Sequence, residues 1–434
     1  MDPFRAEIPP PKLVSALRGY NLLPAIVFLP TRRRCDEAAS EVALDKAQRS
    51  DPERFAQRQM IFDAFAVDFP EVLDHKHSKV IVQAGVAAHH AGHIPSWKLL
   101  IEKMMSAGLL NALFATSTVA AGVDFPARTV VITNADTRGN DGWRSLTASE
   151  LQQMTGRAGR RGRDNVGFVV LAPGQFQNPK RIAELLKAPP DPLESRFRAT
   201  YTSLLNLLDA FGNFEQVREI AEKSFAFRES RRMSADSRQT DGAEMLSDRI
   251  WEPFERRAAV LDHFEYLDQD LETVTESGKW LADLRIDRPL LVGEALKHGT
   301  FNGLTISEAA GLMASVASDA DRSYGEMRAT RRLTDILANF EDIVVAVSNV
   351  EWKNGVEAAE EINYSAAAAA ERWTAGMEWD ELVDRTRAEE GDLVRLLSRT
   401  GEALRQLANL RDSNPAAAAI ALTASEAILR EPVR

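Results

Sequence analysis

Four short apolar runs, separated by segments of helical pattern, constrain the fold of the first 174 residues more than any other feature. They are AIVFL at 25–29, ALFAT at 112–116, VVIT at 130–133 and GFVVL at 167–171. Runs of strand length that are apolar on both faces are typical of central strands in a parallel sheet. Strands that alternate with helices predict a doubly wound α/β domain. In such domains, ligands bind beyond the carboxyl ends of the strands, where we expect the polar motifs to lie.

Polar side chains follow several of these runs. Residues 80–88 have the pattern of another strand, and 95–107 have that of a helix. The side chains at the predicted carboxyl ends are Thr31, Arg32, His89, His90, Thr116 and Thr118. Hydroxyl donors and guanidinium groups at a helix start suit phosphate, although a basic helix cap explains Arg32 equally well when that segment is taken alone.

The adjacent His89 and His90 do not by themselves predict a metal site. A zinc site needs three or four converging ligands, and no second cluster of His, Cys or Asp is apparent nearby. The single cysteine, Cys35, excludes an internal disulfide and argues against a cysteine-based zinc site. We therefore predict no bound metal.

The segment ELQQMTGRAGRRG at 150–162 places Gln153, Arg157 and Arg160 at fixed offsets, with glycines such as Gly156 between them. Two arginines three residues apart share one helical face, so both guanidinium groups are expected to converge on one anion. A single arginine of this kind contributes roughly 10³–10⁵ in the rate of phosphoryl transfer. The alternative is a solvated basic loop.

The net charge of −11 is unevenly distributed along the chain. Residues 1–174 carry 21 Lys and Arg against 18 Asp and Glu, whereas residues 286–434 carry 16 against 25. The acidity thus lies away from the arginine motif and does not argue against a nucleic-acid partner. Without a signal-like leader or an apolar run of about 18 residues, we expect a cytoplasmic protein with no membrane partner.

Taken together, three segments resemble the second motor domain of superfamily-2 DExH helicases. AIVFLPTRRR, VAAHHAGHIPSWKLLIEKMMSAGLLNALFATSTVAAGVDFPART and LQQMTGRAGRRG are similar to motifs IV, V and VI of that family, in order and at suitable spacing. The resemblance implies that Gln153, Arg157 and Arg160, with Gly156, face the ATP phosphates. It implies that Gly122 and Asp124 face ATP or its ribose. It also implies that the nucleic-acid backbone lies near Thr31, Arg32, His90, Thr116 and Thr118.

The following region resembles superkiller-type, exosome-associated RNA helicases. The segment 192–225 (PLESRF, then EKSF at its end) looks like the start of that family's winged-helix domain, and 254–285 looks like its second part. Ser277 and Gly278, between arms of alternating apolar residues, predict a hairpin turn. Some family members carry a long arch-like insertion, but only the polar stretch 229–248 occupies that interval, so we predict no arch.

Residues 286–434 have helical patterns throughout. Apolar residues between Leu393 and Leu410 form one stripe, and MEWDELVDRTRAEEGDLVRLLSRTGEALRQLANL is similar to the family's C-terminal helical bundle. The resemblance implies that Arg395 and Arg399 line a nucleic-acid channel; solvated arginines are the alternative. We thus predict a RecA-like motor domain at 1–174, a winged-helix domain at 175–285 and a helical bundle at 286–434.

A helicase ATPase also needs a Gly-x-x-x-x-Gly-Lys-Ser/Thr loop for phosphates and Mg²⁺. The sequence has none, and it lacks the family's Asp-Glu-x-His segment. We expect the first motor domain to precede residue 1, and this chain alone to bind no ATP or Mg²⁺. The leading hypothesis is the C-terminal portion of an ATP- and Mg²⁺-dependent 3′–5′ helicase that acts on single-stranded nucleic acid, which the resemblance implies is RNA. The alternatives are a stand-alone nucleic-acid-binding or regulatory module without ATPase activity, and a DNA repair helicase fragment.

Overall fold

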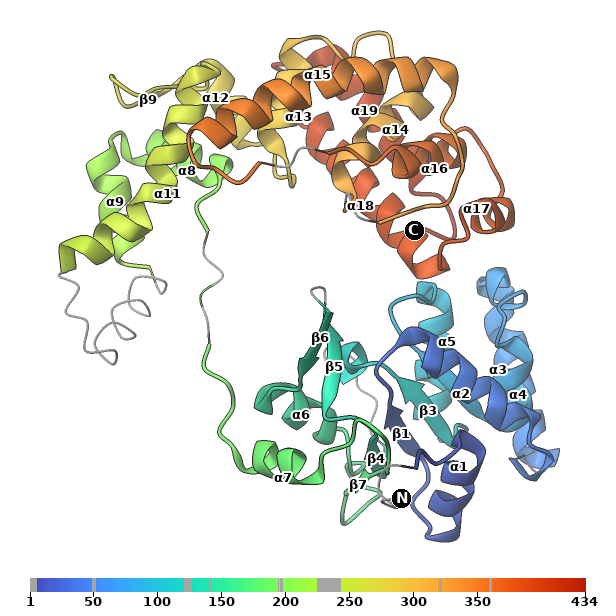
Figure 1. Ribbon diagram of the computed structural model, residues 1–434. Helices are drawn as coiled ribbons and strands as arrows, with labels where there is room; N and C mark the ends of the chain where they lie inside the picture. The colour runs from blue at the N-terminus through green and yellow to red at the C-terminus, as the bar shows by residue number, and fades with distance from the viewer. Residues whose placement is uncertain are drawn as a thin grey trace. The chain divides into compact units, whose positions relative to one another are not determined.

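The computed structural model describes residues 6–48, 52–120, 127–139, 142–193, 195, 198–224, 243–319, 322–358 and 361–434. The chain divides into two compact units. The first comprises Met1–Pro192 with Glu389–Asp392, and the second comprises Leu193–Ala388 with Leu393–Arg434. Figure 1 labels most of the helices and strands of the two units. The predicted three-part division of the chain stays a prediction.

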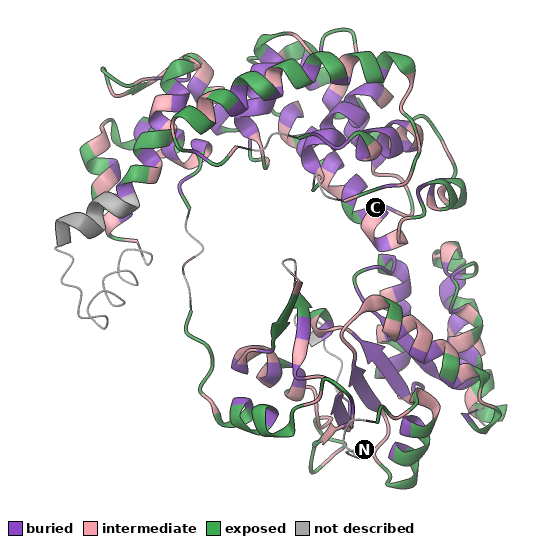
Figure 2. Cartoon of the chain, viewed as in Figure 1, coloured by how far each residue is buried: buried purple, intermediate pink, exposed green. Residues whose placement is uncertain are grey.

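The first unit is built on a five-stranded parallel sheet with the strand order β2-β3-β1-β4-β7. Every residue of the first four strands in this sheet is buried, so both faces of the sheet are covered (Figure 2). This confirms the predicted parallel α/β architecture. The strands are β1 (Ala25–Phe28), β2 (Val86–His89), β3 (Ala112–Ala115), β4 (Thr129–Ile132) and β7 (Phe168–Leu171).

Helices α1 and α2 pack on one face of this sheet through Val14, Leu17 and Ala38, against Val27 and Phe114 of the strands. A separate two-stranded antiparallel hairpin, β5–β6, precedes α6. The remaining elements of the unit are α1 (Pro10–Gly19), α2 (Arg32–Leu44), η2 (Lys46–Gln48), α3 (Pro52–Asp68), η3 (Pro70–Val72), α4 (Ser78–Ala84), α5 (Pro95–Ser106), η4 (Ser117–Ala120), β5 (Asp136–Gly139), β6 (Gly142–Ser145), α6 (Ala148–Thr155) and α7 (Pro179–Lys187).

The strand predicted over residues 80–88 is only partly correct. Its first half belongs to helix α4, which ends at Gly85 in the left-handed conformation (φ 63°), and strand β2 begins directly after it. A short apolar run does not distinguish a buried helical turn from a strand. The glycine, which a helix C-terminus favours, is the signal that separates the two elements.

The largely helical insertion between α2 and α4 contains a fully buried arginine. Arg58 of α3 is fully buried, and its guanidinium donates to the backbone oxygens of Val82 (2.7 Å), Gln83 (3.3 Å) and Leu109 (3.3 Å). Two of these carbonyls belong to the last turn of α4, where helical acceptors lack backbone donors. Arg58 thus ties the insertion to the segments that lead into β2 and β3.

We predict that Arg58→Met loosens this connection. The substitution keeps most of the apolar stem but leaves buried carbonyls without their charged donor, and one such hydrogen bond contributes about 1.5–3 kcal/mol. Hydrogen–deuterium exchange of residues 78–89 should accelerate by at least about tenfold. Arg33→Met is the control, because Arg33 is exposed and pairs with Glu37 four residues along its helix. An equal change in both variants would contradict the assignment.

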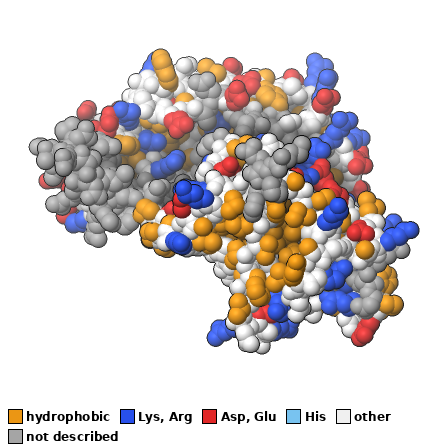
Figure 3. Space-filling view, turned by 60° about the horizontal axis from the view of Figure 1, so that its bottom comes forward, with side chains coloured by type: hydrophobic (Ala, Val, Ile, Leu, Met, Phe, Trp, Pro, Cys, Tyr) orange, Lys and Arg blue, Asp and Glu red, His pale blue; other side chains and the backbone are white. Residues whose placement is uncertain are grey.

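Edge strand β7 differs from its neighbours in burial. Phe168 and Val169 are 36% and 40% exposed, whereas the strands inside the sheet are covered. Figure 3 shows hydrophobic side chains gathered on one face of the molecule.

Among the described residues, no helix has both the length and the hydropathy needed to cross a bilayer.

The second unit is predominantly helical, with one small antiparallel strand pair. Its described elements are α8 (Tyr201–Phe211), α9 (Phe214–Glu222), α11 (Ala243–His263), β8 (Leu267–Asp268), β9 (Thr273–Val274), α12 (Glu276–Ala282), α13 (Pro289–Lys297), α14 (Ile306–Ala317), α15 (Arg331–Lys353), α16 (Tyr364–Thr374), α17 (Trp379–Thr386), α18 (Glu390–Ala408) and α19 (Pro415–Ile428). The predicted helical content of this half of the chain is confirmed. The predicted absence of an arch falls mostly on 229–242, outside the described residues.

The hairpin turn predicted at Ser277–Gly278 is wrong. Both residues lie in α12, which Thr275 caps by accepting from the backbone N–H of Gly278 at 3.0 Å. The hairpin is formed one segment earlier, by β8 and β9. A Cβ on Gly278 would lie 1.9 Å from the backbone oxygen of Tyr266, so this glycine allows the helix to approach the hairpin closely.

The alanine run in α16 packs inside the helical unit. Ala366–Ala370 are all fully buried, and α16 contacts α14 and α19. A Cβ on Gly311 of α14 would lie 3.0 Å from the backbone oxygen of Ala367. Small residues on both helices therefore allow a close approach of their backbones.

Candidate functional site

Thr31 and Thr116 follow neighbouring strands at the same end of the sheet. β1 and β3 are paired in parallel, and the N–H of Leu29 donates to the Ala115 oxygen at 2.8 Å just past their ends. Thr31 caps α2, accepting from the N–H of Arg34 at 3.3 Å. The Thr116 hydroxyl lies 2.9 Å from that of Thr118, and neither is buried. Three hydroxyl-bearing side chains thus lie at the expected edge.

Arg32 also lies at this edge, but acidic groups already hold it. Its Nη1 is 2.6 Å from Oε2 of Glu389 and 2.8 Å from Oδ2 of Asp392, in the short segment counted with the first unit. Both partners are more than 350 residues away along the chain, so no local pattern predicts them. A phosphate would compete with two carboxylates for this guanidinium.

His90 does not lie on the surface as the resemblance implied. Its side chain is 1% exposed, and its Nε2 lies 3.1 Å from Oδ1 of Asp36. The geometry therefore does not support a direct contact between His90 and nucleic acid.

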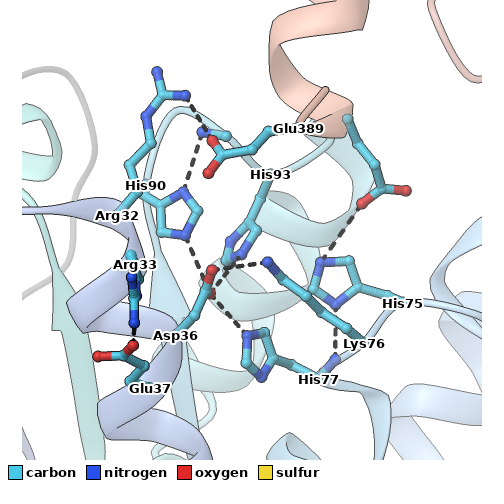
Figure 4. A network of polar contacts seen from close by, with 12 residues as sticks. Arg32, Arg33, Asp36, Glu37, His75, Lys76, His77, His90, His93 and Glu389 are labelled. Carbon is cyan, nitrogen blue, oxygen red and sulfur yellow. Dashed lines mark hydrogen bonds and ion pairs between the residues drawn. The ribbon is translucent and has the colours of Figure 1, made fainter. Parts of the chain in front are cut away.

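Further histidines and one carboxylate surround His90, contrary to the sequence interpretation that no second cluster lies nearby. The Oδ1 atom of Asp36 lies 2.8 Å from Nε2 of His77 and 3.2 Å from Nε2 of His93, and its Oδ2 accepts from Lys76 at 2.7 Å (Figure 4). Burial opposes the charge on Asp36, but the hydrogen bonds from His77, His90 and His93 outweigh it and hold the pKa of this carboxyl well below its usual range. These residues come from separate elements, so their convergence requires the tertiary fold.

The arginine motif begins on a helix but does not continue as one. The capping box of Thr147 and Glu150 starts α6, and the helix ends at Thr155 with Gly156 as its C-cap. Gln153 is exposed on α6, whereas Arg157 and Arg160 lie in the loop after it. The prediction that the two arginines share one helical face is therefore wrong.

Backbone hydrogen bonds fasten this loop beside the amino ends of β4 and β7. The N–H of Ala127 donates to the Arg157 oxygen at 3.0 Å, and the N–H of Gly159 donates to the Ala127 oxygen at 2.7 Å. Gly159 has φ 91°, and a Cβ on Gly167 would lie 2.4 Å from the Ala158 oxygen. The expectation that every motif lies at the carboxyl ends of the strands is thus wrong for the arginine loop.

Asp164 fixes the side chain of Arg160 within the loop. Its Oδ2 accepts from Nε of Arg160 at 2.7 Å and from the Arg160 backbone N–H at 3.0 Å, and its Oδ1 accepts from Nη2 at 3.0 Å. The Asp164 side chain is 2% exposed, whereas that of Arg160 is 21% exposed. One edge of the guanidinium is bound and oriented, and Nη1 lies outside this pair. The i,i+4 spacing of the two residues is a signal that the sequence contains.

This pair makes the stability of the first unit dependent on pH. The hydrogen bond from Arg160 lowers the pKa of Asp164 to about 2, below its ordinary value of about 3.9. Ionised Asp164 therefore stabilises the fold fully above about pH 5, and the contribution is lost as pH falls from about 4 to about 2. Urea unfolding should show that the stability difference between wild type and Asp164→Asn shrinks over this range. Asp74→Asn removes an exposed carboxyl group as a control and should show no such convergence.

The remaining predicted positions divide into two groups. Gly122 and Asp124 lie outside the described residues. On α18, Arg395 is exposed, whereas Arg399 donates to Asp287 (2.5 Å) and Asp319 (3.2 Å). Arg399 is thus already engaged by two carboxylates of its own unit.

Comparison with known proteins finds two matching domains and several helicase relatives. Residues 55–162 match the helicase conserved C-terminal domain, and residues 271–434 match the DSHCT (NUC185) domain. The chain is 37% identical to human superkiller complex protein 2 over 51% of its own length, and 36% identical to the human exosome RNA helicase MTR4 over 45%. It is also 36% identical to the chloroplastic DExH-box ATP-dependent RNA helicase DExH15 of Arabidopsis thaliana over 48%.

The chain is thus similar to the superkiller-type superfamily-2 helicases in two domains. It corresponds to a C-terminal part of these enzymes and combines a RecA-like parallel α/β unit with a helical one. The aligned part of the chain spans only about a fifth of each relative, 18–19% of its length. Neither alternative from the sequence, a stand-alone module or a DNA repair helicase, receives support from these matches.

Proposed function

We propose that this superkiller-type helicase chain supplies the arginine side of an ATP site and part of a single-stranded RNA path in an ATP-dependent 3′–5′ RNA helicase. The observation that carries the proposal is the fixed loop of Arg157 and Arg160. Main-chain bonds hold the loop against β4, and Asp164 orients the Arg160 guanidinium before any anion arrives.

The chemistry of the loop suits a transferred phosphoryl group. Guanidinium groups neutralise charge that develops on phosphate oxygens, and a donor fixed in advance needs no reorganisation during the reaction. Arg157 and Arg160 take this role, and Gln153 on the exposed face of α6 orients the attacking water. Gly122, Asp124 and Gly156 complete the nucleotide contacts in this proposal.

A further RecA-like motor domain is required for this reaction. The chain contains no Gly-Lys-Ser/Thr loop to cradle the β- and γ-phosphates or to hold Mg²⁺. We infer that ATP and Mg²⁺ bind mainly to that domain, and that Arg157 and Arg160 reach the nucleotide from the other side. The chain by itself then hydrolyses no ATP.

The proposed RNA contacts lie at two places, one in each unit. Thr31, Thr116 and Thr118 present hydroxyls at the carboxyl ends of β1 and β3, where they donate to phosphate oxygens. In the helical unit, exposed Arg395 provides the main charge, and Arg399 contributes less because Asp287 and Asp319 hold it.

Two further assignments belong to this proposal. The helices α8, α9, α11 and α12 with the β8–β9 pair form the family's winged-helix domain: the antiparallel pair between α11 and α12 supports a short wing. A cytoplasmic location is also part of the proposal, although one relative, DExH15, is named as chloroplastic.

In the complete enzyme, Arg157→Ala and Arg160→Ala should each lower kcat for RNA-stimulated ATP hydrolysis by about 10³–10⁵, because each removes charge stabilisation in the transition state. The dissociation constant for single-stranded RNA should change less than threefold. Arg161→Ala is the matched control, since Arg161 is an exposed arginine of the same loop. Equal losses of ATP turnover and RNA binding would instead indicate a structural role.

The contributions of Arg395 and Arg399 to RNA binding can be distinguished by the salt dependence of the binding constant K. Each phosphate contact to a single strand adds about 0.7 to the slope of log K against log salt. Arg395→Ala should reduce that slope by about 0.7, and Arg399→Ala should reduce it less. Arg385→Ala serves as control, because Arg385 pairs with Glu381 on α17. If all three variants shift the slope equally, α18 has no specific role in the RNA path.

A further inference from the structure

Five of the seven histidines of the chain are buried in the first unit: His75, His77, His89, His90 and His93. Three of them direct Nε2 at a single atom, Oδ1 of Asp36, at 2.8, 3.1 and 3.2 Å (Figure 4). Their side chains are 4% exposed or less. The proposed helicase function uses none of these contacts.

Hydrogen bonding alone does not explain this arrangement well. A carboxylate has about four acceptor sites on its two oxygens, so one oxygen accepts about two donors. Oδ2 of Asp36 is occupied by Lys76, which leaves three imidazole nitrogens for the two sites on Oδ1. Hydrogen bonds to a charged carboxylate are usually 2.7–2.9 Å long, and only the His77 contact falls in that range. One of the three imidazole nitrogens therefore has no acceptor site left on Oδ1, and the contacts of His90 and His93 are longer than such hydrogen bonds usually are.

The longer two contacts have the spacing of metal ligands. The ligand atoms of Asp36, His90 and His93 all lie within 4.8 Å of one another. Zinc bonds to nitrogen and carboxylate oxygen measure about 2.0–2.2 Å, so neighbouring ligand atoms of a tetrahedral site are about 3.3 Å apart. The distances of 3.1 and 3.2 Å between the Nε2 atoms and Oδ1 come close to that value.

The outer contacts of Asp36 also suit a metal ligand. Lys76 on Oδ2 and His77 on Oδ1 hold the carboxylate in place, as outer hydrogen bonds do around known zinc ligands.

We propose that Asp36, His90 and His93 form a zinc-binding site, with His77 and Lys76 as outer partners of Asp36 and a water molecule in the fourth position. The site joins α2, whose N-cap is Thr31, to the loop after β2. It would therefore stabilise the edge of the sheet that carries the predicted RNA contacts, but it does not depend on helicase activity.

Binding requires one proton to move in His90. In the metal-free arrangement its Nδ1 accepts from the N–H of Gly92 at 3.1 Å, so Nε2 carries the proton that faces Asp36. Zinc on Nε2 shifts this proton to Nδ1 and releases the Gly92 amide. The Nδ1 of His93 is buried without a hydrogen-bond partner among the described residues, so the same shift in that ring breaks no bond.

The test is a zinc titration of the full chain after chelator treatment, in competition with a chromophoric chelator. We expect one equivalent to bind, and Co²⁺ in its place should give the intense visible absorption of a tetrahedral site. Asp36→Asn and His93→Leu should each weaken zinc binding by at least about 100-fold, because replacing even an outer partner of a metal site costs 10–100-fold.

Controls separate this site from adventitious binding and from misfolding. His263→Gln and His298→Gln alter the two histidines outside the cluster and should bind zinc as the wild type does. His77→Gln keeps all three proposed ligands and should lose only about 10–100-fold. Circular dichroism of each variant verifies its fold. Absence of stoichiometric zinc binding by the wild type would overturn the proposal, as would binding that survives both ligand substitutions.

Discussion

The parallel pairing of β1 with β3 on one side and β4 on the other is the constraint on which the first unit depends. Four consecutive residues, Ala25–Phe28, pair in register with both neighbours. Because side chains alternate between faces, a shift of one residue would move every side chain to the opposite face and require both buried layers to repack. The same pairing brings the residues after each strand to one edge, so the positions of Thr31 and Thr116 follow directly from it.

The sequence was sufficient to predict strands β1, β3, β4 and β7 of this sheet, because each lies in a short apolar run. It was insufficient where two elements share one run, as at α4 and β2, and where a glycine serves close packing instead of a turn, as Gly278 does. In both cases the deciding contact comes from another segment: the carbonyl of Tyr266 is the atom that excludes a side chain at 278. Local pattern contains no information on such contacts.

The candidate site shows the same division between local and distant information. The spacing of Arg160 and Asp164 is visible in the sequence, whereas Arg32 meets Glu389 and Asp392, and Asp36 meets histidines 41 to 57 residues away. Motif resemblance identified residue types that suit phosphate, but it did not show which cations are already neutralised. A guanidinium that already binds two carboxylates has a lower affinity for phosphate than an exposed guanidinium. The carboxylate partners therefore distinguish arginines that the motif alone cannot distinguish.

The bonds between Ala127 and the arginine loop have a consequence for motion. The loop exchanges main-chain hydrogen bonds with the residue that leads into β4, and the contact of Gly167 with Ala158 leaves no space for a side chain between them. The loop therefore cannot swing independently of the sheet. In the proposed function, Arg157 and Arg160 would therefore reach a nucleotide only together with the sheet that holds their loop.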